Sequence, residues 1–327
     1  MVRIAVAGVG HLGQHHARVL HGIDGCTLSG VFDTDKKRAR EIAQRHGAPV
    51  FDTYEALLAA SDAVDIAVTT THHHALGKAA LEAGLHVFVE KPITSELWQG
   101  EELVALAEAN DLRLGVGHIE RFNPVVLEAQ AAIDNPMFIE SHRLAPFQPR
   151  GSDVPVILDL MIHDIDLILA FVNSEISGIH ASGVSILTPS IDIANARVEF
   201  ANGAIANVTS SRVSMKTERK LRFFQKDAYI SMDFQAKTVK ILRKSANIAK
   251  LLPKILTGGL GKIDPAELVD ITEVDASTRD KDALTCELEA FVLAVEAGSN
   301  PLVDGRAGLR ALRVAHQIID RIIPAKM

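Results

Sequence analysis

Cysteine is scarce in this sequence, and long apolar runs are missing from it. Only two of the 327 residues are cysteines, Cys26 and Cys286. Two cysteines so far apart form neither a metal-binding spacing nor a disulfide framework. No apolar stretch approaches the roughly 18 residues of a membrane-spanning helix, and the apolar segment at the N-terminus is too short for a signal peptide. The sequence therefore predicts a cytoplasmic protein without a membrane partner.

Positive charge is also in short supply. Lysine and arginine number 34 against 41 acidic residues, which gives a formal net charge of -7, and both signs are spread along the chain. Because a nucleic-acid-binding surface normally needs a basic face, we expect no nucleic-acid partner. A local basic pocket for a phosphorylated substrate remains compatible with this balance. Apolar residues make up 47%, enough for the cores of two domains.

Short apolar strands alternate with helical stretches in the first third of the chain. The expected strands cover residues 3–7, 28–32, 63–69, 86–90 and 113–116. Strands separated by helices of about ten residues are typical of a parallel sheet covered on both faces. We therefore predict a doubly wound Rossmann domain over residues 1–120.

The pattern changes after Asn123-Pro124. One helical stretch, residues 159–171, lies among longer alternating segments, and Ala201-Asn202-Gly203 separates two short β-type runs as a hairpin turn would. Strands without intervening helices form antiparallel sheets. We predict an α/β domain over residues 121–327 with an open, largely antiparallel sheet, and its closing helices could pack back on the first domain.

A glycine-rich loop follows the first expected strand and opens the first expected helix. Gly8, Gly10 and Gly13 match the spacing G-x-G-x-x-G, which has meaning in this context. Gly8 permits the tight turn, Gly10 lets the backbone approach a pyrophosphate, and Gly13 lets helix and strand pack closely. We assign the loop, including His11 and Leu12, to a dinucleotide cofactor; the competing interpretation is a structural turn without a ligand.

An acidic residue follows the glycine loop at the distance that is typical of dinucleotide-binding sites. Asp33 lies 20 residues beyond Gly13, at the end of the second expected strand. A carboxylate there accepts hydrogen bonds from the adenosine ribose hydroxyls and repels a 2′-phosphate. The sequence therefore predicts NAD as the cofactor, while Lys36, Lys37 and Arg38 keep NADP open.

Glu90-Lys91-Pro92 closes the strand expected at residues 86–90. Ligands of an open α/β sheet sit beyond the carboxyl ends of its strands, so Lys91 is aimed at the cofactor crevice. Its ammonium could orient a substrate hydroxyl and assist the loss of its proton. An isolated E-K-P would more often be a surface lysine before a turn.

The glycine loop, a Thr/His-rich turn after the strand expected at 63–69, and the segment A-L-E-A-G-L-H-V-F-V-E-K-P resemble the Gfo/Idh/MocA family of sugar and cyclitol dehydrogenases. The resemblance covers essentially the whole chain. It implies that Lys91 is catalytic and, with Glu90, lies beside the nicotinamide. It also implies a second domain whose open antiparallel sheet mediates oligomers, hence a homodimer or homotetramer.

The Thr/His-rich turn departs from the family pattern. The family usually has a proline where Thr69 stands, and its usual histidine falls at His73; both residues are assigned to the cofactor loop. The run from His72 to His74 invites a metal interpretation. Consecutive residues do not converge easily on one ion, and no cysteine or carboxylate cluster accompanies them, so we expect no metal site.

Asp159, His163 and Asp166 are polar residues in an otherwise strongly apolar helical stretch. Their i, i+4, i+7 spacing places them on one face, where burial is costly unless they are paired or used. A histidine flanked by carboxylates suits proton transfer near neutral pH. A buried histidine satisfied by its helix neighbours, or a metal site, are the competing interpretations.

The family resemblance extends to this stretch through the pattern D-x-x-x-H, matched by Asp159 and His163. It implies that His163 and Lys91 handle the proton of the substrate hydroxyl and that Asp159 orients substrate and histidine. Which of Lys91 and His163 is the immediate base stays open. Asp166 is assigned to substrate binding.

The segment G-H-x-E-R-F-N-P at residues 117–124 resembles family members that act on nucleotide sugars. It implies that Glu120, Arg121 and Asn123 face the substrate, an interdomain salt bridge being the alternative for Arg121. Arg143 and Arg150 are further candidates, because a guanidinium can hold a diphosphate with two hydrogen bonds.

The expected activity is NAD-dependent oxidation of a sugar hydroxyl to a ketone. The resemblance points to the 3-hydroxyl of UDP-N-acetylglucosamine or a related nucleotide sugar. A free-sugar or cyclitol dehydrogenase of the same family and a non-catalytic NAD-sensing regulator are the two alternatives.

Overall fold

The computed structural model describes residues 1–148, 154–245 and 268–322. They form two compact units, one made of residues 1–123 and 281–314 and the other of the described residues within 124–280 and 315–322. Among the described residues, no helix is both long enough and apolar enough to cross a membrane.

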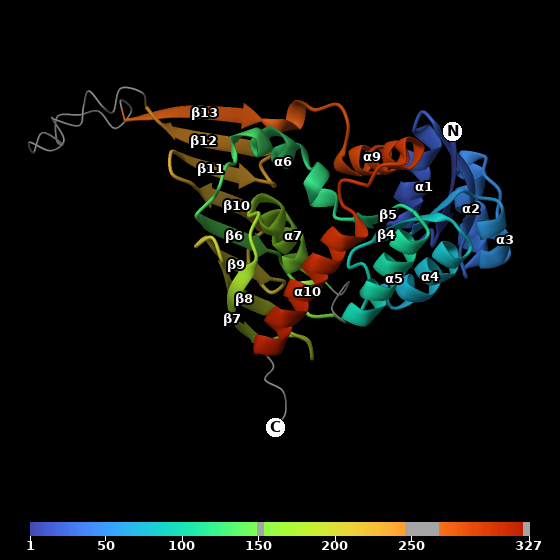
Figure 1. Ribbon diagram of the computed structural model, residues 1–327, viewed down its shortest axis with the longest axis horizontal. Coiled ribbons are helices and arrows are strands. Elements are labelled where there is room, and N and C mark those ends of the chain that lie inside the picture. The colour runs from blue at the N-terminus through green and yellow to red at the C-terminus, as the bar shows by residue number, and fades with distance from the viewer. Residues whose placement is uncertain (149–153, 246–267, 323–327) are drawn as a thin grey trace, which may run out of the picture. The chain divides into compact units, whose positions relative to one another are not determined.

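The first unit is built on a five-stranded parallel sheet with the order β2-β1-β3-β4-β5. Figure 1 labels two of its strands, β4 and β5. Its strands are β1 (Val2–Ala7), β2 (Cys26–Phe32), β3 (Ala63–Ile66), β4 (His86–Glu90) and β5 (Leu114–Gly117). The strand order reverses at β1, which has β2 on one side and β3 on the other. In such sheets the ligand crevice lies at this reversal, beyond the carboxyl ends of the strands.

Helices follow the first four of these strands in the way that the alternating pattern predicted. They are α1 (Gly13–Gly22), α2 (Lys36–His46), α3 (Tyr54–Ala59), α4 (His73–Glu82) and α5 (Leu97–Ala109). Helix α2 begins where the Asp35 side chain accepts hydrogen bonds from the backbone N–H groups of Lys37 and Arg38. The predicted parallel α/β sheet is confirmed.

The C-terminal part of the chain returns to this sheet. Helix α9 (Ala283–Ala297) places Leu288, Phe291 and Val292 in the same buried cluster as Ile4 of β1. Beyond α9, the backbone N–H of Val116 donates to the carbonyl of Val303, so that the edge of β5 is covered.

The second unit carries an eight-stranded sheet with the order β13-β12-β11-β10-β6-β9-β8-β7. All neighbouring pairs are antiparallel except β6 and β9. The strands are β6 (Phe138–Leu144), β7 (Ile176–Val184), β8 (Ile193–Phe200), β9 (Ile205–Ser211), β10 (Glu218–Phe224), β11 (Ala228–Asp233), β12 (Thr238–Lys244) and β13 (Val269–Asp275). The predicted open, largely antiparallel sheet is confirmed, including the hairpin at Ala201-Asn202-Gly203, where Gly203 has φ +87°.

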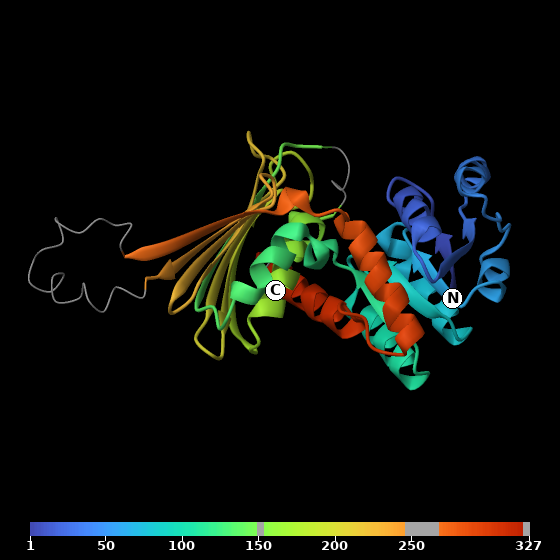
Figure 2. The same cartoon turned by 90° about the horizontal axis from the view of Figure 1, so that it is seen from above.

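Helices lie on one side of this sheet (Figure 2). They are α6 (Pro124–Ala129), the π-helical turn η4 (Ile157–Met161), α7 (Ile162–Phe171) and the end of α10 (Gly305–Ile322). Alternate strand residues such as Ile139, Phe223 and Ile230 are buried, and the ring of Phe223 contacts that of Phe171 in α7. The helix expected at residues 159–171 is therefore present, but its first turn is π-helical.

Candidate active site

The glycine loop joins β1 to α1. Gly8 has φ +87°, and a Cβ there would lie 2.6 Å from a methyl carbon of Val68. A Cβ on Gly13 would lie 1.8 Å from the carbonyl oxygen of Gly8, so only glycine lets the helix begin here. At Gly10, by contrast, no atom lies within 4 Å of the Cβ position. The backbone at Gly10 is thus open to the approach of a pyrophosphate, and the loop fits a dinucleotide.

Asp33 is held beside this loop at the carboxyl end of β2. Its Oδ2 accepts a hydrogen bond from the backbone N–H of Val9 at 2.8 Å, and its Oδ1 accepts one from the N–H of Asp35 at 2.9 Å. These contacts orient the carboxylate in the position where an adenosine ribose is bound in dinucleotide sites.

Two of the three cationic side chains near Asp33 donate hydrogen bonds to backbone carbonyls of the protein. The Arg38 guanidinium donates to the carbonyl oxygens of Val9 at 2.9 Å and Gly10 at 3.3 Å. The Lys36 ammonium donates to the carbonyl of Asp52 at 2.7 Å and lies over the Phe32 ring. Both cations are thus tied to backbone carbonyls, and the Asp33 carboxylate, which repels a 2′-phosphate, favours NAD over NADP.

His73 connects the turn after β3 to the Glu90-Lys91-Pro92 segment. The imidazole is buried, with Nδ1 2.9 Å from the carbonyl of Pro92 and Nε2 3.2 Å from that of Val68. Burial lowers the pKa of His73, so the ring is neutral near pH 7 and donates only one hydrogen bond. We assign that bond to the shorter contact, which ties the turn to the cis peptide Lys91–Pro92.

The other side chains of this turn have contacts different from those of His73. Thr69 is exposed, with its hydroxyl 3.4 Å from that of Thr71. His74 Nε2 lies 2.6 Å from Glu102 Oε2, and His72 is exposed. The three histidines therefore diverge, as expected from consecutive positions.

Lys91 is half-buried at the carboxyl end of β4. Its backbone N–H donates to Glu90 Oε2 at 3.2 Å, while Glu90 Oε1 lies 3.1 Å from His16 Nε2. His16 Nδ1 in turn lies 2.8 Å from Asp65 Oδ2. His16 and Asp65 were not predicted as site residues from the sequence. The available signal was a carboxylate in β3, a strand whose four residues are all buried.

The polar residues predicted in the second unit occupy different environments. Asp159 in η4 and His163 in α7 are half-buried, whereas Asp166 is 1% exposed. Arg143 of β6 is buried and holds Asp164 through two hydrogen bonds, Nε to Oδ2 at 2.8 Å and Nη2 to Oδ1 at 2.9 Å. This pairing joins β6 to α7, and the contact of Arg143 with a diphosphate stays a prediction.

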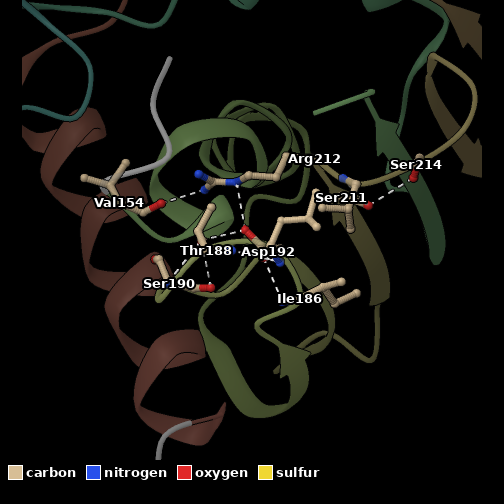
Figure 3. Close-up of polar contacts among 10 residues, drawn as sticks. Val154, Ile186, Thr188, Ser190, Asp192, Ser211, Arg212 and Ser214 are labelled. Atoms are coloured by element: carbon tan, nitrogen blue, oxygen red, sulfur yellow. Dashed lines mark hydrogen bonds and ion pairs between the residues drawn. The ribbon is translucent and has the colours of Figure 1, made fainter. Parts of the chain in front are cut away.

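A buried carboxylate organises the chain that leads into η4 (Figure 3). Asp192 Oδ2 accepts hydrogen bonds from the N–H groups of Ile186, Leu187 and Thr188 at 2.6 to 2.9 Å. Arg212 lies 3.9 Å from Asp192 and donates to the carbonyl of Val154 at 2.6 Å. Asp192 and Arg212 thus anchor the segment from which the turn with Asp159 starts.

The segment proposed to face the substrate forms the 3-10 helix η2 (Ile119–Phe122) and its ends. Asn123 Nδ2 donates to Glu120 Oε2 at 2.8 Å, and Glu120 is 8% exposed. Arg121 is half-buried. Arg150, the other candidate for a diphosphate, lies outside the described residues.

Comparison with known proteins identifies the family. Residues 2–118 match the description "Oxidoreductase family, NAD-binding Rossmann fold", and residues 126–231 match "GFO/IDH/MocA C-terminal domain". UDP-N-acetylglucosamine 3-dehydrogenase of Acidithiobacillus ferrooxidans is 37% identical over 97% of this chain and 96% of that protein. The chain belongs to the GFO/IDH/MocA family.

Other members and solved structures agree with this assignment. A crystal structure of the Acidithiobacillus ferrooxidans enzyme has a TM-score of 0.87 and covers 98% of this chain and 97% of that one. Myo-inositol 2-dehydrogenase of Thermotoga maritima is 25% identical over 96% of this chain and 94% of its own length. A 17% identical Agrobacterium radiobacter oxidoreductase, solved with NAD+, L-tartaric acid and magnesium, shares the fold with a TM-score of 0.84 over 99% of this chain and 97% of that one. As a GFO/IDH/MocA protein, the chain is an oxidoreductase with an NAD-binding Rossmann domain, as predicted.

Alanine at two loop positions should separate cofactor binding from folding. We expect Gly10→Ala to melt like the wild type but to bind NAD at least about tenfold more weakly (~1.4 kcal/mol), because a methyl group then meets the pyrophosphate. Gly13→Ala should lose stability as well, since its Cβ would lie 1.8 Å from the Gly8 carbonyl oxygen. Thermal unfolding and NADH fluorescence titration measure the two effects. Unchanged NAD affinity in Gly10→Ala would contradict this account of the loop.

Asp192 makes stability depend on pH in the acid range. Burial opposes ionisation, but hydrogen bonds from Thr188, Ile186 and Leu187 outweigh it and lower the pKa of Asp192 from 3.8 to about 2. Because the folded value is the lower one, the carboxylate stabilises the fold above pH 3.8, and this contribution is lost as pH falls through about 2. We expect Asp192→Asn to be less stable at pH 6 and to lose less stability between pH 6 and pH 3.

Urea unfolding at the two pH values measures this difference, with the exposed Asp227→Asn as the control. Parallel pH dependence in Asp192→Asn and the wild type would show that Asp192 does not carry the effect.

Proposed function

We propose that the protein is an NAD-dependent dehydrogenase that oxidises the 3-hydroxyl of UDP-N-acetylglucosamine, or of a related nucleotide sugar, to a ketone. The observation that carries the proposal is the 37% identity over 97% of the chain to an enzyme named for this reaction. Lys91 lies at the carboxyl end of β4, at the same edge of the parallel sheet as the glycine loop after β1 and Asp33 after β2, and this position supports the proposal.

In the proposed reaction the protein manages the proton of the substrate hydroxyl. Lys91 and His163 share the roles of orienting this hydroxyl and accepting its proton, and Asp159 orients the imidazole and the sugar. NAD, when bound, would supply the acceptor for the hydride that leaves the carbon bearing this hydroxyl. The protein contributes position and proton transfer, both of which depend on side chains held by the strand end of β4 and by η4 and α7.

The proposal divides the work between two domains. Residues 1–120 bind NAD through Gly8, Gly10, Gly13 and the residues around them. Residues 121–327 bind the sugar and carry the oligomer interface. Glu120, Arg121, Asn123 and Asp166 are the proposed substrate contacts, and Arg121 and Arg150 are the proposed partners of the diphosphate. Arg143, which Asp164 holds through two hydrogen bonds, is a further candidate for the diphosphate.

The cytoplasmic location belongs to the same proposal and rests on the low cysteine content.

The sheet of the second unit supports the proposed homo-oligomer. A row of apolar side chains crosses the sheet on the face away from the helices, since these residues alternate with the buried ones. In register from strand to strand, the row consists of Ile205, Phe138, Phe224, Tyr229, Leu242 and Ile271.

The aromatic members of this row contact one another. The ring centroids of Phe138 and Phe224 are 5.5 Å apart and those of Phe224 and Tyr229 are 4.8 Å apart, while Ile271 is 63% exposed. A continuous apolar row on an open sheet face is typical of a protein interface.

A single charge in the row should disrupt the oligomer. We expect Leu242→Asp to shift the protein to monomers in sedimentation velocity, because a carboxylate would be desolvated at the interface. Ile186→Asp, at a position 58% exposed in the loop between β7 and β8, is the control and should leave the association state unchanged. If Leu242→Asp sediments like the wild type, the interface does not use this face.

Substitution of Lys91 tests the catalytic assignment. Lys91→Ala should lower kcat by about 10² to 10⁴-fold, since proton transfer contributes on that order, while NAD binding remains measurable. Initial rates of NADH formation and a cofactor titration measure the two quantities. Retained turnover would remove Lys91 from the mechanism.

The substrate is tested with the wild type on a panel of UDP-N-acetylglucosamine, myo-inositol and free hexoses. We expect NADH formation with the nucleotide sugar. Turnover of inositol or hexoses alone would overturn the nucleotide-sugar assignment in favour of a cyclitol or free-sugar dehydrogenase. NAD binding without turnover on any member would favour an NAD-sensing protein.

A further inference from the structure

Three ionisable side chains meet beneath the strand ends of the first unit. His16 of α1 lies between Asp65 of β3 and Glu90 of β4, with Nδ1 2.8 Å from Asp65 Oδ2 and Nε2 3.1 Å from Glu90 Oε1. His16 is 1% and Asp65 0% exposed. The proposed mechanism gives none of the three a part in proton transfer, so their burial needs a reason.

The geometry determines how many protons this cluster holds. Both ring nitrogens of His16 face carboxylate oxygens, and ionised carboxylates only accept hydrogen bonds. A neutral imidazole has a single N–H and can donate in only one of the two contacts. An imidazolium has two N–H groups and donates a hydrogen bond in both. Burial disfavours that charge, but the carboxylates of Asp65 and Glu90 more than offset it and keep the pKa of His16 well above its usual range.

The surroundings shift the pKa values of the two carboxyl groups in opposite directions. Burial raises the pKa of Asp65. Burial acts on Glu90 in the same sense, but the hydrogen bond and charge of His16 and the charge of Lys91 hold the pKa of Glu90 below its usual range. Glu90 is therefore the ionised member next to Lys91.

Glu90 is fixed in place from several sides. Its Oε2 accepts the backbone N–H of Lys91 at 3.2 Å, and a Cβ on Gly117 of β5 would lie 3.1 Å from its carboxyl atoms. The absence of a side chain at Gly117 thus leaves the space that the carboxylate occupies. The Phe88 ring packs near His16, with centroids 6.2 Å apart, which keeps the cluster dry.

Further ionisable groups lie on the elements packed against α1, and their surroundings differ from those of His16. The thiol of Cys26 in β2 is half-buried, and the charges of Asp65 and Glu296 act on it. At the start of α9, Asp282 lies 3.6 Å from Arg18. Glu287 of α9 is buried, and Arg38 of α2 donates to the glycine loop.

We propose that His16 is a positioning residue for the reaction: as an imidazolium that bridges Asp65 and Glu90, it keeps the Glu90 carboxylate ionised and oriented beside Lys91. The negative charge next to the lysine is then constant across the working pH range. This inference rests on the proposed catalytic role of Lys91.

Removal of the imidazolium has a defined consequence. Without it the largely buried Glu90 carboxylate keeps only Lys91 as a cationic neighbour and loses the hydrogen bond of His16, so it takes up a proton more readily. The charge beside Lys91 disappears, the ammonium is less stabilised, and the lysine releases its proton at lower pH. The acid limb of the pH profile of kcat/KM therefore moves to lower pH.

The first experiment compares this limb in the wild type, His16→Gln and His86→Gln. We expect His16→Gln to shift its midpoint down by about one pH unit, the usual size of such a charge effect, with NAD affinity preserved. His86 lies at the start of the same strand, where its Nδ1 accepts the N–H of Arg113, so His86→Gln should leave the midpoint unchanged. A His16→Gln profile that coincides with the wild type, with only stability reduced, would overturn the proposal.

A second measurement does not depend on turnover. In ¹⁵N-histidine-labelled protein, the His16 signal, identified by its loss in His16→Gln, should show both ring nitrogens protonated from pH 6 to pH 9. A neutral ring in that range would overturn the proposal, whatever the activity. If instead Lys91→Ala retains turnover while His16 stays protonated, the catalytic role of Lys91 fails, and with it the positioning role of His16, although the buried imidazolium is present.

Discussion

The close approach of Gly13 to the carbonyl of Gly8 determines how the first unit is assembled. With 1.8 Å between the oxygen and a Cβ at Gly13, the loop tolerates only glycine, and helix α1 can begin directly against the strand ends. This placement brings His16, one turn into the helix, within hydrogen-bond distance of β3 and β4. The cofactor loop and the charge cluster below Lys91 thus have the same structural origin.

The second unit uses buried polar pairs for a comparable purpose. Arg143 and Asp164 join β6 to α7, and Asp192 with Arg212 anchors the chain before η4. Such pairs add little stability over well-packed apolar residues, yet breaking one is costly, so they favour a single arrangement. The half-buried Asp159 and His163 lie on the elements held in this way. A π-helical turn at this position is itself often associated with function.

Local patterns were sufficient for much of the fold and for part of the site. The glycine spacing, Asp33 and the E-K-P strand end each depend on neighbours within a few residues or on one strand–helix–strand repeat, so their placement could be predicted. Arg143 shows the limit, because its partner Asp164 is 21 residues away and contacts it only through the packing of α7 on the sheet. No local pattern in the sequence indicates that this guanidinium has a carboxylate partner.

The sequence by itself determined the parallel sheet, the antiparallel sheet, the cofactor loop and the family, because these follow from periodicity and short motifs. Only the tertiary structure decided that His16, Asp65 and Glu90 form one cluster. They stand 49 and 25 positions apart along the chain. The order in which strands pair brings β3 and β4 side by side under α1, and no local pattern encodes that neighbourhood. The physical reason is that burial and strand pairing, acting over long separations, select the partners of buried charges.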